Sequence, residues 1–364
     1  MNIDFANLKV AYQRHQVQFD KAIKNSLKSA NYIMGPEIEE LERKLSKFTG
    51  AKHSISCASG TDALLLALMA LDIQPGDEII TTPFTFIATA ETIALIGATP
   101  VFVDISAETY NIDVNLIEGK ITENTKAILP VSLFGQIADM DEINAIAKKH
   151  NLSVIEDGAQ SFGATYKNKK SGNLSTIACT SFFPAKPLGC FGDGGAVFTS
   201  DSMLAEKLKS LRVHGQTERY RHNRIGLCSR LDNLQAAVLL VKLNHYEEDI
   251  NKRQSAAKRY NKLLKNILPT PIVKEYNSSV WAQYSIRIKS RKFIRDKLNS
   301  KDIPTATHYP IPLHLQECFK YLAYKEGDFP ISESVSREII SLPINPYISY
   351  EEQIYICEEI KKLL

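Results

Sequence analysis

Short apolar runs alternate with helical stretches along most of the chain, from about residue 30 to residue 245. Each apolar run is short, rich in strand-forming residues and bounded by turn residues, which is typical of a buried strand. Apolar strands separated by helices indicate a mostly parallel sheet with both faces covered, the core of an α/β domain. The pattern predicts strands at residues 54–58, 78–81, 100–103, 127–131 and 152–155, and helices at residues 63–71, 87–95 and 140–150.

The pattern changes near residue 231. Residues 231–260 have helical periodicity and few helix breakers, so we expect one long helix that leaves the large domain. Further strand and helix patterns follow at residues 285–288 and 350–364. We therefore expect residues 1–245 to form a large domain that includes an N-terminal helix, and residues 246–364 to form a smaller C-terminal α+β domain.

Composition narrows the class of protein. The chain has 364 residues, which suffice for two domains, and its 44% hydrophobic and 23% charged residues are typical of a soluble globular protein. The net charge of +3 gives no electrostatic reason to expect a nucleic acid or a membrane surface as partner. No apolar run reaches the roughly 18 residues that span a bilayer, and the N-terminus lacks a secretion signal.

The cysteines favour a reduced, cytoplasmic enzyme. They are scattered and contain no C-x-x-C pair, so a disulfide framework or a zinc site is not expected, and we predict no metal. The six positions are Cys57, Cys179, Cys190, Cys228, Cys318 and Cys357.

Lys186 has the surroundings of a lysine that reacts with aldehydes. Aromatic and proline residues precede it in Ser181-Phe-Phe-Pro-Ala-Lys186, and a glycine-rich turn follows it. Apolar surroundings remove solvation from an ammonium and lower its pKa, and a neutral amine can form a Schiff base. An ordinary loop lysine would be the better interpretation of this segment alone.

A second segment suits a phosphate group. Residues 58–62, Ala-Ser-Gly-Thr-Asp, join a predicted strand to an apolar helix. The free N–H groups and the positive dipole end at a helix start favour an anion. Gly60 allows close approach of the backbone, and Thr61 adds a hydroxyl donor. The alternative is a plain turn with Thr61 or Asp62 as the helix cap.

Two further segments supply groups for a pyridine ring. Asp157 ends a predicted buried strand, where open α/β sheets bind ligands, and its carboxylate could keep a pyridine nitrogen protonated. A helix cap and a metal ligand are the alternatives. Phe86, at a strand-to-helix junction, could stack on the ring or belong to the core. Together with Lys186 and Gly60, these residues predict a site for pyridoxal 5′-phosphate (PLP).

Nearly end to end, the chain resembles the DegT/DnrJ/EryC1/StrS family of PLP-dependent sugar-nucleotide aminotransferases. The resemblance implies the fold-type I aminotransferase architecture and a homodimer with residues of both subunits in each active site. The motifs that carry it are Gly35-Pro-Glu, Ser59-Gly-Thr-Asp-Ala-Leu, Pro75-Gly-Asp-Glu, Thr85-Phe-Ile-Ala-Thr, Glu156-Asp-Gly-Ala-Gln, Ser181-Phe-Phe-Pro-Ala-Lys, Gly192-Asp-Gly-Gly-Ala, His214-Gly, Arg230-Leu-Asp, Gln235-Ala-Ala and His308-Tyr-Pro.

The resemblance also implies roles for individual residues. Lys186 holds PLP as a Schiff base, Asp157 pairs with the pyridine nitrogen, and Gln160 approaches the ring hydroxyl. Phe86 stacks on the ring. The phosphate is bound by Gly60, Thr61 and Ser181.

Substrate contacts are implied for Arg230, His308 and Tyr309, with Arg230 reaching into the partner's site. One position departs from the family pattern. Many members have an asparagine two residues before the arginine of the R-L-D motif, where it touches the phosphate across the dimer. This chain has Cys228 there, and a thiol is a poor phosphate donor.

The expected reaction is amino transfer from L-glutamate to a nucleotide-linked keto-sugar. Residues 181–195 and Trp281-Ala-Gln-Tyr most resemble members that aminate a UDP-2-acetamido-3-oxo-uronic acid, as in bacterial surface polysaccharide (O-antigen) biosynthesis. Arg230 would then pair with the sugar carboxylate.

Three alternatives stay open. The substrate could be a 3-keto or 4-keto 6-deoxyhexose on UDP or dTDP. The chain could instead be a non-catalytic PLP-binding regulator. A nucleotide-binding module without PLP is the third, although the chain lacks the G-x-G-x-x-G and G-x-x-x-x-G-K-[ST] motifs.

Overall fold

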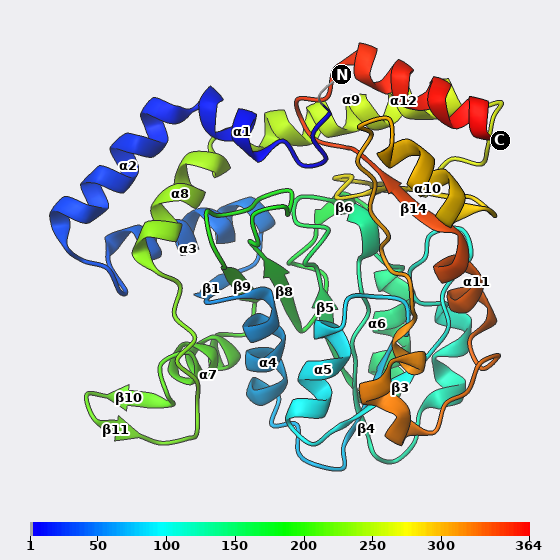
Figure 1. Ribbon diagram of the computed structural model, residues 1–364. Coiled ribbons are helices and arrows are strands. Elements are labelled where there is room, and N and C mark those ends of the chain that lie inside the picture. Colours follow the sequence, from blue (N-terminus) through cyan, green and yellow to red (C-terminus); the bar gives the residue numbers. More distant parts are fainter. Residues whose placement is uncertain (1–2) are drawn as a thin grey trace.

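A seven-stranded sheet lies at the centre of the computed structural model, which describes residues 3–364 (Figure 1). Its strand order is β1-β9-β8-β5-β4-β2-β3. Neighbouring strands from β8 to β3 run parallel, whereas β9 runs antiparallel to both β8 and β1. The bounds are β1 His53–Cys57, β2 Glu78–Thr81, β3 Thr99–Phe102, β4 Thr125–Ile128, β5 Ser153–Asp157, β8 Ile177–Ser181 and β9 Gly195–Thr199.

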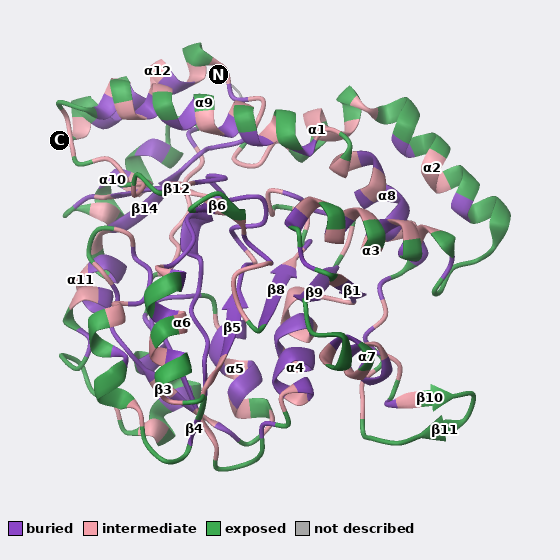
Figure 2. Ribbon diagram, turned by 180° about the vertical axis from the view of Figure 1, so that it is seen from behind, coloured by how far each residue is buried: buried purple, intermediate pink, exposed green. Residues whose placement is uncertain are grey.

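Both faces of this sheet are buried, because successive residues of a strand face opposite ways. Ile79 of β2 and Ile155 of β5 belong to a core that includes residues of α4, α5 and α7. Their neighbours Ile80 and Val154 belong to a second core, which includes residues of α3, α6 and α8. Figure 2 shows the buried strands between these helices. The helices are α3 Pro36–Thr49, α4 Gly60–Ala70, α5 Ala88–Leu95, α6 Met140–Lys149, α7 Ser202–Leu211 and α8 Asn233–Leu243.

A smaller C-terminal α+β part has its own apolar core. Its strands β13 Tyr284–Arg287 and β14 Ile339–Leu342 pair antiparallel, and α9 Tyr246–Leu264, α10 Arg291–Asn299 and α12 Tyr350–Leu363 cover them. This part lies at the top of the view in Figure 1.

The remaining elements are mostly short. In Figure 1, α2 extends to one side of the molecule and the β10–β11 hairpin projects below α7. The bounds are α1 Leu8–Arg14, α2 Gln16–Ser29, β6 Thr165–Tyr166, β7 Lys169–Lys170, β10 Gln216–Glu218, β11 Arg221–His222, β12 Asn277–Ser278 and α11 Pro330–Glu338. No helix within residues 3–364 combines the length and the apolar character needed to cross a bilayer.

The predicted fold class, a mostly parallel sheet between helices with a smaller C-terminal α+β part, is confirmed. The prediction of one helix over residues 231–260 is wrong, since α8 ends at Leu243 and α9 begins at Tyr246. The two helices pack on different partners: α8 contacts α2 and α3, and α9 contacts α12. A break between them allows each helix to face its own neighbours. The proposed domain boundary at residues 245 and 246 stays a prediction.

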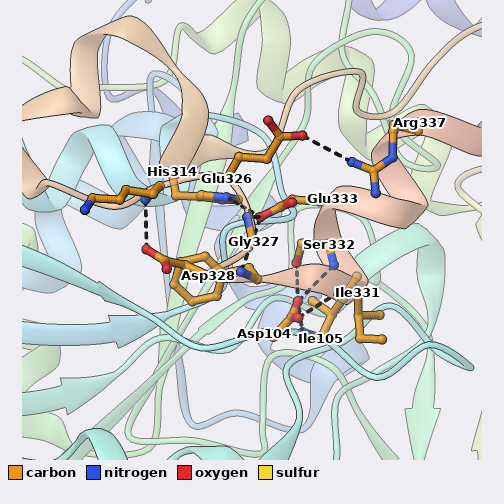
Figure 3. A network of polar contacts seen from close by, with 12 residues as sticks. Asp104, Ile105, His314, Glu326, Gly327, Asp328, Ile331, Ser332, Glu333 and Arg337 are labelled. Carbon is orange, nitrogen blue, oxygen red and sulfur yellow. Dashed lines mark hydrogen bonds and ion pairs between the residues drawn. The ribbon is translucent and has the colours of Figure 1, made fainter.

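One buried carboxylate fastens the segment before β14 to the large domain, and a second holds that segment together (Figure 3). The carboxylate of Asp104, just after β3, accepts hydrogen bonds from the Ile331 and Ser332 N–H groups, both at 2.9 Å, and from the Ser332 hydroxyl. This carboxylate therefore caps the start of α11. Oε1 of Glu333 accepts hydrogen bonds from the Gly327 N–H at 2.8 Å and from His314 Nε2 at 3.1 Å. The same segment begins near His308 and Tyr309, two of the predicted site residues.

Asp104→Ala should lower thermal stability, because two buried donors and one partly buried donor at the start of α11 lose their acceptor. The free energy of unfolding should fall by about 3 kcal/mol, and a lower Tm would show this loss. Asp113→Ala is the matched control, since the Asp113 carboxylate accepts exposed hydrogen bonds from Asn115 alone. Equal Tm values for the two variants would contradict the proposed anchoring role of Asp104.

Candidate active site

Most predicted cofactor residues gather at the carboxyl ends of the parallel strands. Asp157 is the last residue of β5 and Ser181 is the last residue of β8. Gly60 opens α4, directly after β1, and Phe86 lies between β2 and α5. Lys186 lies in the loop between β8 and β9. Open α/β sheets bind their ligands at this edge, so the topology places these groups where a ligand is expected.

The Asp157 carboxylate is 5% exposed and held by two hydrogen bonds. Its Oδ2 accepts from the Thr89 hydroxyl at 2.8 Å, and its Oδ1 accepts from the Ala159 N–H at 3.1 Å. Burial raises the pKa of Asp157, whereas these two donors and the charge of Lys186 lower it. A cationic partner would offset the cost of burying this carboxylate. The protonated pyridine nitrogen of PLP is such a partner.

Lys186 is half-buried, and its Nζ atom forms no hydrogen bond or ion pair within residues 3–364. Burial lowers the pKa of Lys186, while the negative charge of Asp157 raises it. A lowered pKa increases the fraction of neutral amine at neutral pH, which is the form that attacks an aldehyde. The Lys186 amine therefore fits the aldehyde carbon of PLP.

The start of α4 packs directly against the ends of β8 and β9. A Cβ atom added at Gly60 would lie 2.5 Å from Cβ of Ser181, and one at Gly195 would lie 2.3 Å from the carbonyl oxygen of Ser59. Ser59 caps the helix, since its hydroxyl accepts from the Asp62 N–H at 3.0 Å. The N–H groups of Gly60 and Thr61 lie in the first turn, where an α-helix offers no acceptor. Glycine at position 60 therefore lets the helix start pack against Ser181, so that the free N–H groups and the Ser181 hydroxyl lie close enough together to bind one phosphate.

Gln160 connects the sheet to the C-terminal part of the chain. Its Nε2 donates to the Tyr309 hydroxyl at 3.0 Å, and its Oε1 accepts from the Phe134 N–H at 2.8 Å. The ring centroids of Tyr309 and Phe86 are 6.2 Å apart, and Phe86 is 53% exposed. Phe86 is therefore exposed enough to cover the face of a bound ring.

His308 lies next to Tyr309 in the same subunit. Its Nδ1 lies 2.8 Å from the hydroxyl oxygen of Ser341 in β14. Burial, and to a smaller extent the charge of Lys186, lowers the pKa of His308 to about 4. The imidazole is therefore neutral at physiological pH and can donate or accept a hydrogen bond without adding charge.

The structure does not bring Arg230 into contact with the other predicted site residues. Its Nη2 lies 2.9 Å from Sγ of Cys228, which is exposed. Its Nε is buried and has no partner within residues 3–364. The predicted contacts of Arg230 with substrate, like those of His308 and Tyr309, stay predictions.

Sequence analysis assigned no role to Thr89 or Ser341. Thr89 holds the Asp157 carboxylate, and its hydroxyl lies 3.1 Å from that of Thr85. The signal for Thr89 was its place in the motif Thr85-Phe-Ile-Ala-Thr, one helical turn after Thr85. Ser341 had no local signal, because its contact with His308 joins two segments of the C-terminal part. Within residues 3–364, no three His, Cys, Asp or Glu side chains are grouped to hold a metal.

Gly60→Ala should weaken PLP binding, because the added methyl group clashes with Ser181 and displaces the start of α4. We expect a roughly tenfold or larger rise in the dissociation constant of PLP and a stability loss of about 1–3 kcal/mol. Gly119→Ala is the control, since an added Cβ there has nothing within 4 Å. Titration of the unloaded protein with PLP measures the effect, and an unchanged constant would contradict the packing argument.

Stability of the unloaded protein should fall as the pH drops from about 6.5 towards 4. Over this range His308 binds a proton in the unfolded chain but not in the folded one, since its folded pKa is lowered to about 4. His308→Gln should remove roughly 2 kcal/mol of this acid sensitivity. Melting curves at about pH 7 and pH 4.5 measure it. The same acid-induced loss in both proteins would exclude a buried neutral His308.

Comparison with known proteins places the whole chain in one family. The model of the DegT/DnrJ/EryC1/StrS aminotransferase family matches residues 13–361. The chain is 51% identical over 356 residues to the UDP-2-acetamido-2-deoxy-3-oxo-D-glucuronate aminotransferase of Pseudomonas aeruginosa, covering 98% of each chain.

Solved structures agree with this assignment. DesV of S. venezuelae, solved in complex with a ketimine intermediate, has a TM-score of 0.97 and 39% identity, over 100% of this chain and 98% of that one. NtdA of Bacillus subtilis, solved with bound cofactor PMP, has a TM-score of 0.92 and 30% identity, over 99% and 85% of the two chains. The residues at the sheet edge fit the same cofactor, so the chain belongs to the DegT/DnrJ/EryC1/StrS aminotransferase family and is a PLP-dependent sugar-nucleotide aminotransferase.

Proposed function

We propose that this enzyme transfers the amino group of L-glutamate to a UDP-2-acetamido-3-oxo-uronic acid. The observation that carries the proposal is the 51% identity, over almost the full length of both chains, with an aminotransferase for a UDP-linked 3-oxo-glucuronate. Arg230 supports it, since its buried Nε has no partner and a guanidinium is well suited to a uronate carboxylate.

When bound, PLP supplies an electron sink that allows an amino group to move between two carbon skeletons. The chain's own residues prepare and direct this chemistry. The Asp157 carboxylate, oriented by Thr89, would keep the pyridine nitrogen protonated. The start of α4 and the Ser181 hydroxyl would hold the phosphate. The Nζ amine of Lys186 would be the base that takes a proton from the α-carbon of the donor.

The substrate end of the site includes His308 and Tyr309 of the same subunit. The Tyr309 hydroxyl is fixed by Gln160, and burial raises its pKa, so it stays protonated as a hydrogen-bond donor. His308 is neutral and fixed by Ser341. Both side chains can orient a sugar without adding a charge.

We further propose a homodimer in which Arg230 serves the site of the other subunit. Among residues 3–364 the Arg230 guanidinium forms a hydrogen bond only to Cys228, so it is available to a second copy. The proposal includes a cytoplasmic location, because all six cysteines are free thiols. It also includes a role in the biosynthesis of a bacterial surface polysaccharide such as O-antigen.

The proposed reaction can be tested in two halves. Addition of L-glutamate to the PLP-loaded enzyme should convert the absorbance of bound PLP to that of pyridoxamine phosphate. A UDP-3-oxo-uronic acid should restore the original spectrum, and neutral 3-keto or 4-keto 6-deoxyhexoses on UDP or dTDP should do so far more slowly. Faster restoration by a neutral sugar would assign the enzyme to the 6-deoxyhexose branch. A loaded protein that responds to no amino donor would be a PLP-binding regulator.

Arg230→Ala should raise KM for the uronate by roughly tenfold to a hundredfold, because a charge-assisted contact is lost, and should change KM for a neutral keto-sugar little. Steady-state assays with both sugars measure the difference. Equal effects on the two sugars would exclude the carboxylate role.

Subunit mixing tests the shared site. Lys186→Ala and Arg230→Ala subunits are mixed, reassociated and assayed at a uronate concentration far below the raised KM of Arg230→Ala, where both parents are nearly inactive. The mixture should regain up to about a quarter of wild-type activity, since one site of each hybrid dimer is then intact. A mixture no more active than its parents would place Arg230 in the site of its own subunit.

A further inference from the structure

A chain of two buried hydroxyl groups ends at the His308 ring. Ser285 of β13 and Ser341 of β14 are directly opposite each other in the antiparallel pair, and their Oγ atoms lie 2.8 Å apart. Oγ of Ser341 also lies 2.8 Å from Nδ1 of His308. Ser285 is 2% exposed and Ser341 is 0% exposed. The chain therefore connects the interior of the C-terminal part to a predicted substrate residue.

The backbone holds the segment of His308 against β14. The Ser341 N–H donates to the carbonyl oxygen of Ala306 at 2.8 Å, and the Ala306 N–H donates to the carbonyl oxygen of Ser341 at 3.2 Å. Ala306 precedes His308 by two residues. The contact between the His308 ring and the Ser341 hydroxyl is therefore supported by two backbone hydrogen bonds at the same serine.

The partners of the two hydroxyl groups give the chain a direction. The Ser285 hydroxyl has one hydrogen-bond partner within residues 3–364, the Ser341 hydroxyl, so Ser285 donates its proton there. Ser341 then donates its own proton to Nδ1 of His308. In the reverse order the Ser285 proton would have no acceptor among these residues, and a buried donor without a partner is costly. The chain therefore favours an Nδ1 atom that carries no proton.

The single proton of the neutral His308 ring then lies on Nε2. Burial, and to a smaller extent the charge of Lys186, lowers the pKa of His308 to about 4, so the ring carries one proton at neutral pH. Nε2 forms no hydrogen bond within residues 3–364, yet it is not a buried atom. A neutral imidazole that accepts at Nδ1 donates from Nε2. His308 thus offers an N–H group beside the ring of Tyr309, with centroids 5.7 Å apart.

We propose that Ser341, supported by Ser285, is a positioning residue that fixes the ring proton of His308 on Nε2 and so provides an N–H donor for an oxygen of the keto-sugar. The inference rests on the proposed function, since it takes His308 to contact the sugar. Carbonyl and carboxylate oxygens accept hydrogen bonds and do not donate them. The opposite tautomer would present an unprotonated nitrogen to these oxygens and would repel them.

Nitrogen NMR of the PLP-loaded enzyme, labelled in its histidines, tests the tautomer without any sugar. The signals of His308 are identified by their loss in His308→Gln. At neutral pH the wild type should show a protonated Nε2 and an unprotonated Nδ1. A ring proton on Nδ1 would overturn the proposal, because the hydroxyl chain would then run in the opposite direction, with Ser285 donating to a water.

Two serine variants show which hydroxyl sets the tautomer. Ser341→Ala removes the donor to Nδ1, so both tautomers should become populated and the two ring-nitrogen signals of His308 should move towards each other. Ser285→Ala should keep the wild-type signals, because Ser341 can still donate to Nδ1. Wild-type signals in Ser341→Ala, or an equal change in both variants, would overturn the proposal.

Steady-state kinetics connect the tautomer to the sugar. Ser341→Ala should raise KM for the keto-sugar roughly tenfold, the loss expected for one hydrogen bond, and should change the half-reaction with L-glutamate little. Ser336→Ala is the matched control, since this serine of α11 is also buried and its hydroxyl has no partner within residues 3–364. It should keep the wild-type KM. Equal effects of the two variants, or an equal loss in both half-reactions, would overturn the sugar contact.

The NMR and kinetic results separate failure of this inference from failure of the proposed function. A wild type that aminates a keto-sugar but carries the His308 proton on Nδ1 would refute this inference alone. A wild type that carries the proton on Nε2 but reacts with no keto-sugar would refute the proposed function and still support the hydroxyl chain.

Discussion

Desolvation of Asp157 and Lys186 is the constraint on which the active site depends. Asp157 is buried and Lys186 is half-buried. Burial raises the pKa of Asp157 and lowers the pKa of Lys186, which favours the neutral form of each group. A cofactor that carries a protonated ring nitrogen and an aldehyde satisfies both groups at once, the first with charge and the second with a covalent bond. The rest of the structure maintains these two positions.

The sheet and the C-terminal part contribute to this arrangement in different ways. Parallel strands place Asp157 and Ser181 at one edge of the sheet. The close contact of Gly60 with Ser181 places the start of α4 against the same edge. The substrate side instead depends on the segment that carries His308 and Tyr309. That segment is held by Ser341 at one end, while the buried carboxylates of Asp104 and Glu333 hold the region that follows it (Figure 3).

The positions of the predicted cofactor residues in the fold could be inferred from sequence because their signals are local, while their roles stay predictions. A strand followed by Gly60 or by Asp157 already implies a position at the edge of a sheet, and the strand and helix patterns of the large domain lie close to the observed bounds. The family resemblance then supplied roles that spacing alone left open, such as that of Gln160.

What sequence could not show depends on contacts between distant segments. The break at His245 arises because α8 and α9 pack on different helices, although the local pattern is helical throughout. Asp104 and Glu333 have no local sequence signal for their contacts. Only the fold brings Asp104 to the start of α11 and Glu333 to His314.

The most direct test of the central claim is to reduce the PLP-loaded enzyme with borohydride and locate the modified residue by peptide mass spectrometry. Reduction makes a lysine–PLP Schiff base permanent, so the label marks the reacting amine. The predicted result is a pyridoxyl phosphate group on Lys186, absent when Lys186→Ala is treated in the same way. Label on another lysine, or none in the wild-type protein, would contradict the assignment of Lys186 and the mechanism built on it.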